Sequence, residues 1–195
     1  MKLEKFKEIE IRYGDVASWA IWADESDKPK SNIGDMDVLD PDRNPDLLAS
    51  LNPAVVMVGL NISRAVSFAK PFMNFHDANP RGQDYKLRYA FRDTPYSGAY
   101  MTDLIKGLEM VDSKEALKYV KKTPGELERH IESFIEELEF VSETKPLIIA
   151  LGRDVYDLMK RHLDESAYER LIRVTHYSHQ VAKEKYRDDC LEALA

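Results

Sequence analysis

The sequence predicts a three-layer α/β/α sandwich, in which helices cover both faces of a central, mostly parallel four-stranded sheet. From Leu47 onward, strand-like and helix-like segments alternate, which is typical of parallel strands joined by helices. The strand-like segments are continuously apolar, as expected for strands covered on both faces. The 195-residue length fits one ordinary domain. We therefore expect residues 1–195 to form a single domain, with residues 1–45 as an N-terminal extension packed on the core.

The N-terminal extension contains one candidate strand and one candidate loop. Residues 15–23 contain alternating apolar side chains and two tryptophans, which favours an edge strand packed on the main body. Residues 24–45 are rich in Pro, Gly, Asn and Asp, the usual turn formers. We expect this second stretch to connect the N-terminal element to the core.

The strands of the central sheet are predicted from short apolar runs. Residues 53–59 read Pro-Ala-Val-Val-Met-Val-Gly, and their β-branched content argues against a helix. Further strands are expected at residues 99–105, 146–152 and 171–176. All of these runs are far shorter than the roughly 18 apolar residues of a membrane-spanning helix.

The clearest helix lies between the second and third of these strands. Thr123 is expected to cap it, with Pro124 in its first turn and Glu126 completing a capping box. Its apolar residues recur at helical spacing and predict one buried face: Leu127, Ile131, Phe134, Ile135 and Leu138. Residues 154–163 and 180–194 are expected to form two more helices.

Composition limits the class of protein. A hydrophobic fraction of 44% with 32% charged residues is typical of a soluble globular protein. The N-terminus has no apolar stretch of a secretory signal. Cys190 is the one cysteine, which excludes an internal disulfide and a four-cysteine metal cluster. These features fit a cytoplasmic protein without a membrane partner.

Charge gives a mixed indication about nucleic acid. The net charge of −7 argues against broad non-specific binding of phosphates. A local basic patch can nevertheless exist, because six basic residues fall within one stretch: Lys70, Arg81, Lys86, Arg88, Arg92 and Lys106. If the protein binds DNA, we expect these side chains to form the contacting rim.

Polar residues gather where the predicted strands end. In open parallel sheets, ligands bind outside the carboxyl ends of the strands. The four exits read Gly59-Leu60-Asn61-Ile62-Ser63, Thr102-Asp103, Gly152-Arg153-Asp154 and His176-Tyr177-Ser178-His179. This pattern predicts one site at that edge of the sheet.

Each exit also has a simpler structural interpretation. Asn61 and Asp103 are both residue types that cap helices. The spacing of His176 and His179 suits a metal ion, although a third ligand is missing from this loop. Residues 72–76, Phe-Met-Asn-Phe-His, could equally be packing residues.

Taken in order, the exits resemble the motifs of the uracil-DNA glycosylase superfamily. Residues 59–63 are similar to its Gly-x-Asn-Pro-Gly motif, and residues 100–106 to its Thr-Asn-x-x-Lys pattern. The aliphatic run that ends at Gly152 and the sequence Thr175-His-Tyr-Ser178 resemble its last two strands, the second of which leads into His-Pro-Ser. The correspondence covers about residues 46–195.

The resemblance implies a hydrolase of base-excision DNA repair, which extrudes a base from DNA and cuts its N-glycosidic bond. Asn61 would orient the attacking water, and His176 would stabilise negative charge on the departing base. An aromatic ring from residues 72–75, which include Phe72 and Phe75, would stack on that base, and Ser178 would hold a phosphate. Phe75 is among the substrate-binding residues implied. The remaining substrate-binding residues implied are Gly59, Leu60, Ser63, Asn74 and Asp103. No metal and no other cofactor is implied.

Three departures from the family motifs bear on function. Ile62 and Tyr177 stand where the motifs have proline, so both loops lose a fixed φ. Asp103 stands where the family has asparagine. An ionised carboxylate only accepts hydrogen bonds, so it opposes uracil O4 and suits paired donors such as guanine N1–H and its 2-amino group. An alternative function is therefore a non-catalytic module that binds a base or a free nucleotide.

Overall fold

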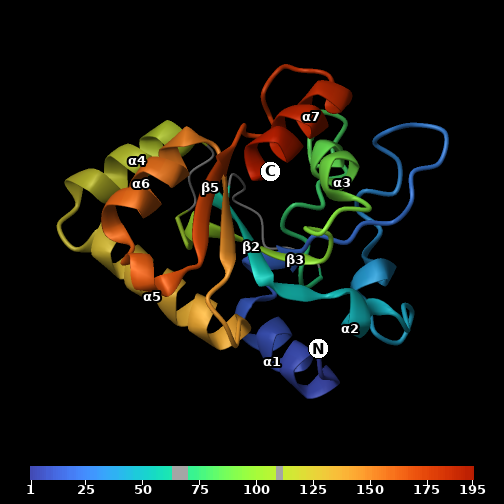
Figure 1. The fold of residues 1–195 in the computed structure, drawn as a ribbon, viewed down its shortest axis with the longest axis horizontal. Helices are drawn as coiled ribbons and strands as arrows, with labels where there is room; N and C mark the ends of the chain where they lie inside the picture. Colours follow the sequence, from blue (N-terminus) through green and yellow to red (C-terminus); the bar gives the residue numbers. More distant parts are fainter. Residues whose placement is uncertain (63–69, 109–111) are drawn as a thin grey trace.

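The computed structural model describes residues 1–62, 70–108 and 112–195. It confirms the predicted α/β fold, with helices on both faces of a mostly parallel sheet (Figure 1). The sheet has five strands rather than the predicted four, in the order β1-β3-β2-β4-β5. The additional strand is β1 (Ala17–Trp19), which lies within the N-terminal segment where an edge strand was expected.

The other four strands form the parallel part of the sheet. They are β2 (Asn52–Asn61), β3 (Ala99–Ile105), β4 (Leu147–Leu151) and β5 (Arg170–Val174). β1 pairs with β3 in the antiparallel direction, and every other pairing is parallel. The predicted strands are thus correct in position to within two residues. β2 continues through residues 60 and 61, beyond its predicted end at residue 59.

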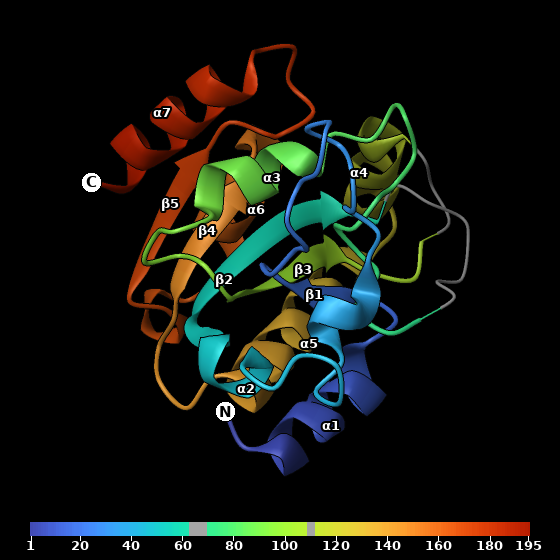
Figure 2. The ribbon, with the colours of Figure 1, turned by 90° about the vertical axis from the view of Figure 1, so that its right-hand side faces the viewer.

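The helices divide between the two faces of the sheet (Figures 1 and 2). One face packs against α1 (Leu3–Tyr13), α4 (Ser113–Lys122), α5 (Glu126–Val141) and α6 (Arg153–His162). The opposite face packs against α3 (Tyr85–Phe91) and α7 (Lys183–Leu194). The described residues also contain three short helical segments: η1 (Met36–Leu39), α2 (Leu47–Ser50) and η2 (Glu165–Ala167).

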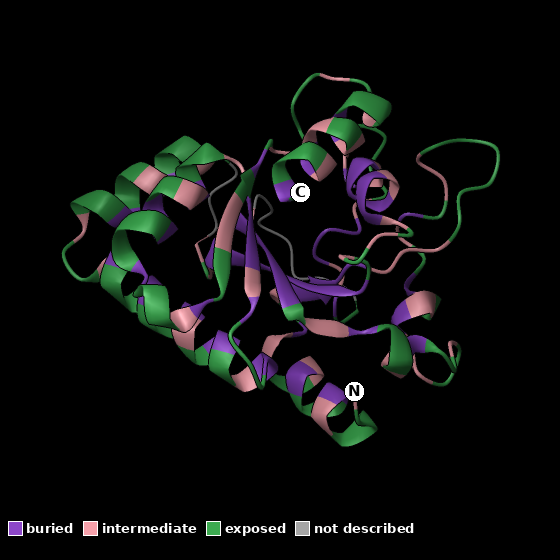
Figure 3. Cartoon of the chain, viewed as in Figure 1, coloured by how far each residue is buried: buried purple, intermediate pink, exposed green. Residues whose placement is uncertain are grey.

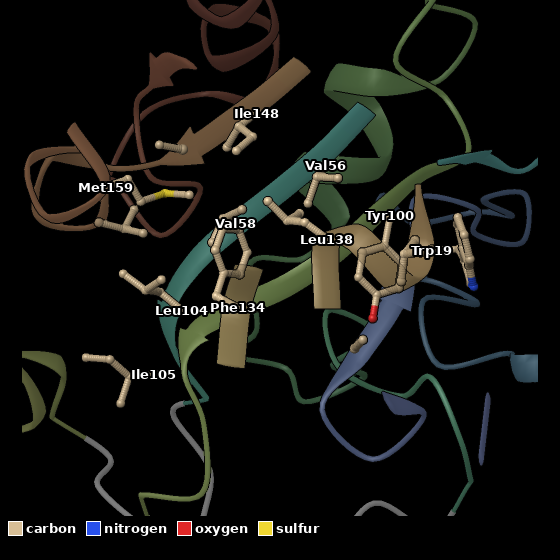
Figure 4. Close-up of a cluster of buried hydrophobic side chains, with 14 of the residues drawn as sticks. Trp19, Val56, Val58, Tyr100, Leu104, Ile105, Phe134, Leu138, Ile148 and Met159 are labelled. Carbon is tan, nitrogen blue, oxygen red and sulfur yellow. The ribbon is translucent and has the colours of Figure 1, made fainter. Parts of the chain in front are cut away.

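The core is therefore two apolar layers separated by the sheet. On the α5 side, Tyr100 and Leu104 of β3 meet Phe134 and Leu138 of α5 (Figure 4). On the other side, Met101 of β3 lies in the cluster that includes α3 and α7. The outward helix faces are exposed, β3 is buried throughout, and the edge strand β5 is partly exposed (Figure 3).

The predicted start of the long helix is wrong. Thr123 does not cap α5 but ends α4, where its N–H donates to the Tyr119 carbonyl. Gly125 precedes α5 with φ +79°, and no side chain caps that helix. A glycine adopts this left-handed conformation without steric cost, which lets the chain turn between two consecutive helices.

Strand alternation brings the candidate residues to one face. Side chains two apart on a strand share a side of the sheet. Val55 and Met57 of β2 face α3 and α7, so Gly59 and Asn61 lie on that same side. Asp103 follows Met101 on the same face of β3, and Gly59 is its register partner.

The helices described by the structure include none that is long and apolar enough to cross a membrane.

Candidate functional site

A cavity of about 290 Å³ lies at the carboxyl end of the sheet. Its lining includes eight of the nine predicted site residues: Gly59, Leu60, Asn61, Asn74, Phe75, Asp103, His176 and Ser178. Ser63, the ninth, lies outside the described residues. The structure thus brings together side chains that are up to 119 positions apart in the sequence, and their chemical roles stay predictions.

Gly59 forms part of the cavity wall because Asp103 lies directly over it. A Cβ at position 59 would overlap with Asp103 Oδ1 and would also contact the Phe75 ring. Any other residue at position 59 would therefore push the carboxyl group aside. Glycine is needed here because of this close approach.

Asp103 is held by Asn74 from the loop before α3. Asn74 Nδ2 donates to Asp103 Oδ2 over 2.8 Å and to the Val16 carbonyl over 3.1 Å. Asn74 Oδ1 accepts from the Phe75 N–H over 3.2 Å. The two backbone partners fix the orientation of the amide, because a carbonyl only accepts and an N–H only donates. Asn74 must therefore donate to Asp103.

The environment of Asp103 opposes ionisation. The residue is 3% exposed, and burial is the largest influence raising its pKa to about 7. The Asn74 hydrogen bond and the Lys106 ammonium lower the pKa, whereas the Glu137 and Asp84 carboxyls raise it. A carboxyl with this pKa exchanges a proton readily near neutral pH.

Phe75 adopts a backbone conformation that is unusual for a bulky residue. Its φ is +64°. Two hydrogen bonds fix this segment: Asn74 Oδ1 accepts from its N–H, and Trp22 Nε1 donates to its carbonyl over 3.0 Å. The ring is 5% exposed and lies edge-on to Tyr177, with centroids 6.3 Å apart. The phenyl ring is therefore set firmly against the wall of the cavity.

His176 is a neutral hydrogen-bond donor with a defined tautomer. The Ser178 backbone N–H donates to its Nδ1 over 3.2 Å, and the Ser178 hydroxyl lies 2.7 Å from the same nitrogen. Nδ1 is thus an acceptor, so Nε2 carries the proton. Burial lowers the pKa of His176 to about 4. In this arrangement the Ser178 hydroxyl proton is directed at His176, and it would have to rotate to hold a phosphate.

Two helices begin at the rim of the cavity. α4 contributes Ser113 and Lys114, and α6 contributes Arg153 and Asp154. The chain enters α6 through Gly152, whose φ of +115° favours glycine. Sequence reasoning overlooked α4, although Asp112 is a strong cap whose carboxylate accepts from the N–H groups of residues 114 and 115.

Asn61 lies at the end of β2 and is 7% exposed. Its Nδ2 donates to the Ile62 carbonyl over 3.3 Å. Asn61 is the last residue of the strand, and it lines the cavity together with Leu60. The interpretation of Asn61 as a helix cap concerns residues 63–69, which lie outside the described residues.

The prediction of a basic rim is wrong for three of its six members, Lys86, Arg88 and Lys106, which are turned into the fold. Arg88 is 2% exposed and donates to the carbonyls of Ala23, Pro29 and Ser31. Lys86 is 3% exposed and donates to the His179 carbonyl. Lys106 is paired with the buried Glu137. Lys70 and Arg92 lie at the surface beside Asp37 and Asp24, and Arg81 is exposed. The charges of Lys86, Arg88 and Lys106 therefore serve the fold, and the other three remain available to a surface.

The spacing of His176 and His179 does not create a metal site within the described part of the chain. The described residues contain no group of three or more His, Cys, Asp or Glu side chains placed to bind an ion.

Comparison of the chain with protein-family models, with curated proteins and with solved structures finds no match. The class supported directly is thus an α/β/α protein with a polar cavity at the carboxyl end of its sheet.

Proposed function

We propose that this protein is a DNA glycosylase-type hydrolase, which cuts the N-glycosidic bond of a damaged or unusual base. The observation that carries the proposal is that two groups line the same cavity. They are the neutral His176, with a proton on Nε2, and the buried carboxyl of Asp103. The cavity volume of about 290 Å³ is close to the lower limit of the usual range for ligand sites, about 300–1,000 Å³, and so suits a single base.

The proposed reaction assigns a separate task to each side chain. A water oxygen held by Asn61 forms a bond to the anomeric carbon while the carbon–nitrogen bond to the base breaks. The electron pair of that bond leaves with the base, and the proton released by the water returns to the base or to solvent. The His176 Nε2–H stabilises the departing charge without having to lose a proton, because this imidazole is neutral at physiological pH.

The test is a panel of oligonucleotides that carry uracil, mismatched thymine, hypoxanthine, xanthine and alkylated bases, scored for abasic sites. We expect one of them to be cleaved and His176→Gln to slow that cleavage by about 100- to 1,000-fold, as for the loss of one transition-state donor. His179→Gln is the matched control, because this neighbouring histidine is exposed and does not line the cavity. Equal loss in both variants, or no cleavage of any substrate, contradicts the proposal.

A second candidate function is a non-catalytic module that binds a base or a free nucleotide. The internal use of Lys86, Arg88 and Lys106 favours it, because these cations are not displayed for DNA phosphates. This candidate predicts binding of nucleosides in the cavity without bond cleavage and without the steep salt dependence of a DNA-binding protein.

A further inference from the structure

The carboxyl of Asp103 is presented to the cavity as a hydrogen-bond acceptor. Asn74 uses one lone pair of Oδ2, and its amide orientation is fixed by Val16 and Phe75. Oδ1 lies above Gly59, where the absent Cβ leaves it room. A carboxylate has about four lone-pair positions, so acceptor capacity remains on both oxygens after the Asn74 bond.

We propose that Asp103, supported by Asn74 and Gly59, recognises a base that presents two adjacent N–H donors, such as a guanine-type edge with a ring N–H beside an exocyclic amino group. This inference rests on the proposed function, since it names the class of base bound in the same cavity. Phe75 lies against the same wall and supplies an apolar surface beside the recognised edge.

A uracil-type edge fits this group less well. It places a carbonyl oxygen on each side of its single N–H, so a carboxylate faces like charge at one or both positions. Asn74 cannot reverse the arrangement, because turning its amide would leave the Val16 carbonyl and the Phe75 N–H facing like groups. The fixed orientation of the Asn74 amide therefore favours ligands that present hydrogen-bond donors to Asp103.

Protonation provides an independent signature. Paired donors bind the ionised carboxylate, so binding should strengthen as pH rises through the pKa of about 7. The charged groups that act on Asp103 are Lys106 after β3, Glu137 on α5 and Asp84 at the start of α3. The His176 pKa of about 4 keeps that ring neutral at pH 6 and above, so the effect is not due to its titration.

The experiment is calorimetric titration of the full chain with 2′-deoxyguanosine, 2′-deoxyinosine and 2′-deoxyuridine at pH 8 and pH 6. We expect deoxyguanosine to bind about tenfold or more tightly than deoxyinosine, which lacks the amino group, and than deoxyuridine. Its affinity should fall about fivefold to tenfold at pH 6, where the carboxyl is mostly protonated. Asp103→Asn should remove both effects, whereas Glu128→Gln, which removes an exposed charge on α5, should retain them.

Several results would overturn the inference: tighter binding of deoxyuridine, no binding of any nucleoside, or unchanged selectivity in a folded Asp103→Asn protein. Chromatography of the titrated samples detects any cleavage of the nucleosides. It therefore distinguishes failure of this inference from failure of the proposed function. Selective binding of deoxyguanosine, in a protein that cleaves no oligonucleotide or nucleoside, would reject the hydrolase while leaving the recognition role intact.

Discussion

The two sides of β3 handle a buried carboxyl group in different ways. On the side of α5, Glu137 is fully buried but is paired with the Lys106 ammonium and accepts a hydrogen bond from Tyr100 over 2.8 Å. On the side of the cavity, Asp103 is held by one neutral amide donor, from Asn74. One carboxyl is neutralised by the protein itself, and the other is left with capacity for a ligand.

This difference separates a carboxyl that is paired within the fold from the carboxyl to which we assign the recognition role. A buried ion requires a partner of opposite charge, and Glu137 obtains one within the fold. Tyr100 belongs to the same buried group as Glu137 and Lys106. Burial, and to a smaller extent the Glu137 charge, holds the pKa of the Tyr100 phenol well above its usual range. Burial alone therefore does not distinguish the two carboxyls. Among the described residues, Glu137 has an ion-pair partner, whereas Asp103 has none and lies beside a cavity.

The largest effect on stability is expected when one member of the ion pair on the α5 side is removed. Glu137→Gln should leave the Lys106 ammonium buried without its counter-ion, and we expect a loss of about 3–5 kcal/mol in the free energy of unfolding, measured by urea denaturation. The double variant Lys106→Met/Glu137→Leu removes both charges and should recover most of that loss. A single variant as stable as wild type would mean that this ion pair does not stabilise the fold.

On the cavity side of β3, Asp103 is expected to make folding stability depend on pH. Folded Asp103 has a pKa of about 7, against 3.8 without the fold, so unfolding between these values releases a proton and rising pH destabilises the folded state. About three pH units at 1.4 kcal/mol each give a loss of up to about 4 kcal/mol. Asp103→Asn should abolish this loss, so its stability relative to wild type should increase from pH 4 to pH 7.

Comparison between the two proteins is essential because three histidines act in the opposite direction. Burial lowers the pKa values of His76 and His176 to about 4 and also lowers the pKa of His130, so all three residues add stability as pH rises towards 6.5. The wild-type profile mixes these effects, whereas the difference between the profiles isolates Asp103. Parallel profiles for wild type and Asp103→Asn would show that the carboxyl ionises as readily in the folded chain as in the unfolded chain.

The smallest effect on stability is expected in the loop that contains Asn74 and Phe75 and borders the cavity. Trp22→Phe removes the hydrogen bond to the Phe75 carbonyl and should cost about 1 kcal/mol. We also expect faster hydrogen exchange at the Phe75 amide, measured by NMR. Trp19→Phe is the control, because Trp19 Nε1 has no hydrogen-bond partner in the described part of the chain. Slower or unchanged exchange in Trp22→Phe would show that this bond does not restrain the loop.

The buried strands were the most predictable part of the molecule. β2, β3 and β4 are apolar runs whose character depends on covering from both faces, and that requirement is visible in a single sequence. Helix α1 was missed, although Phe6 and Ile9 are buried at helical spacing. The N-terminal β1 entered the sheet by pairing with β3, which is a contact between residues more than 80 positions apart.

The candidate site was predictable in membership but not in geometry. The rule that ligands bind at strand exits brought Asn61, Asp103 and His176 to one edge of the sheet. The Asn74 bond to Asp103 depends on a loop that no local pattern specifies. The basic residues were misjudged for a related reason: Arg88 is buried by backbone carbonyls of residues 23–31, and carbonyls leave no trace in amino-acid composition.

The contact between Gly59 and Asp103 also restricts the order in which the two positions can change. With Asp103 present, a side chain at position 59 collides with its carboxyl, so an alanine there is harmful. Once residue 103 has become small, the same alanine fills space that is otherwise empty. A mutational route that alters both positions must therefore begin at 103, and the reverse order passes through an unfavourable intermediate.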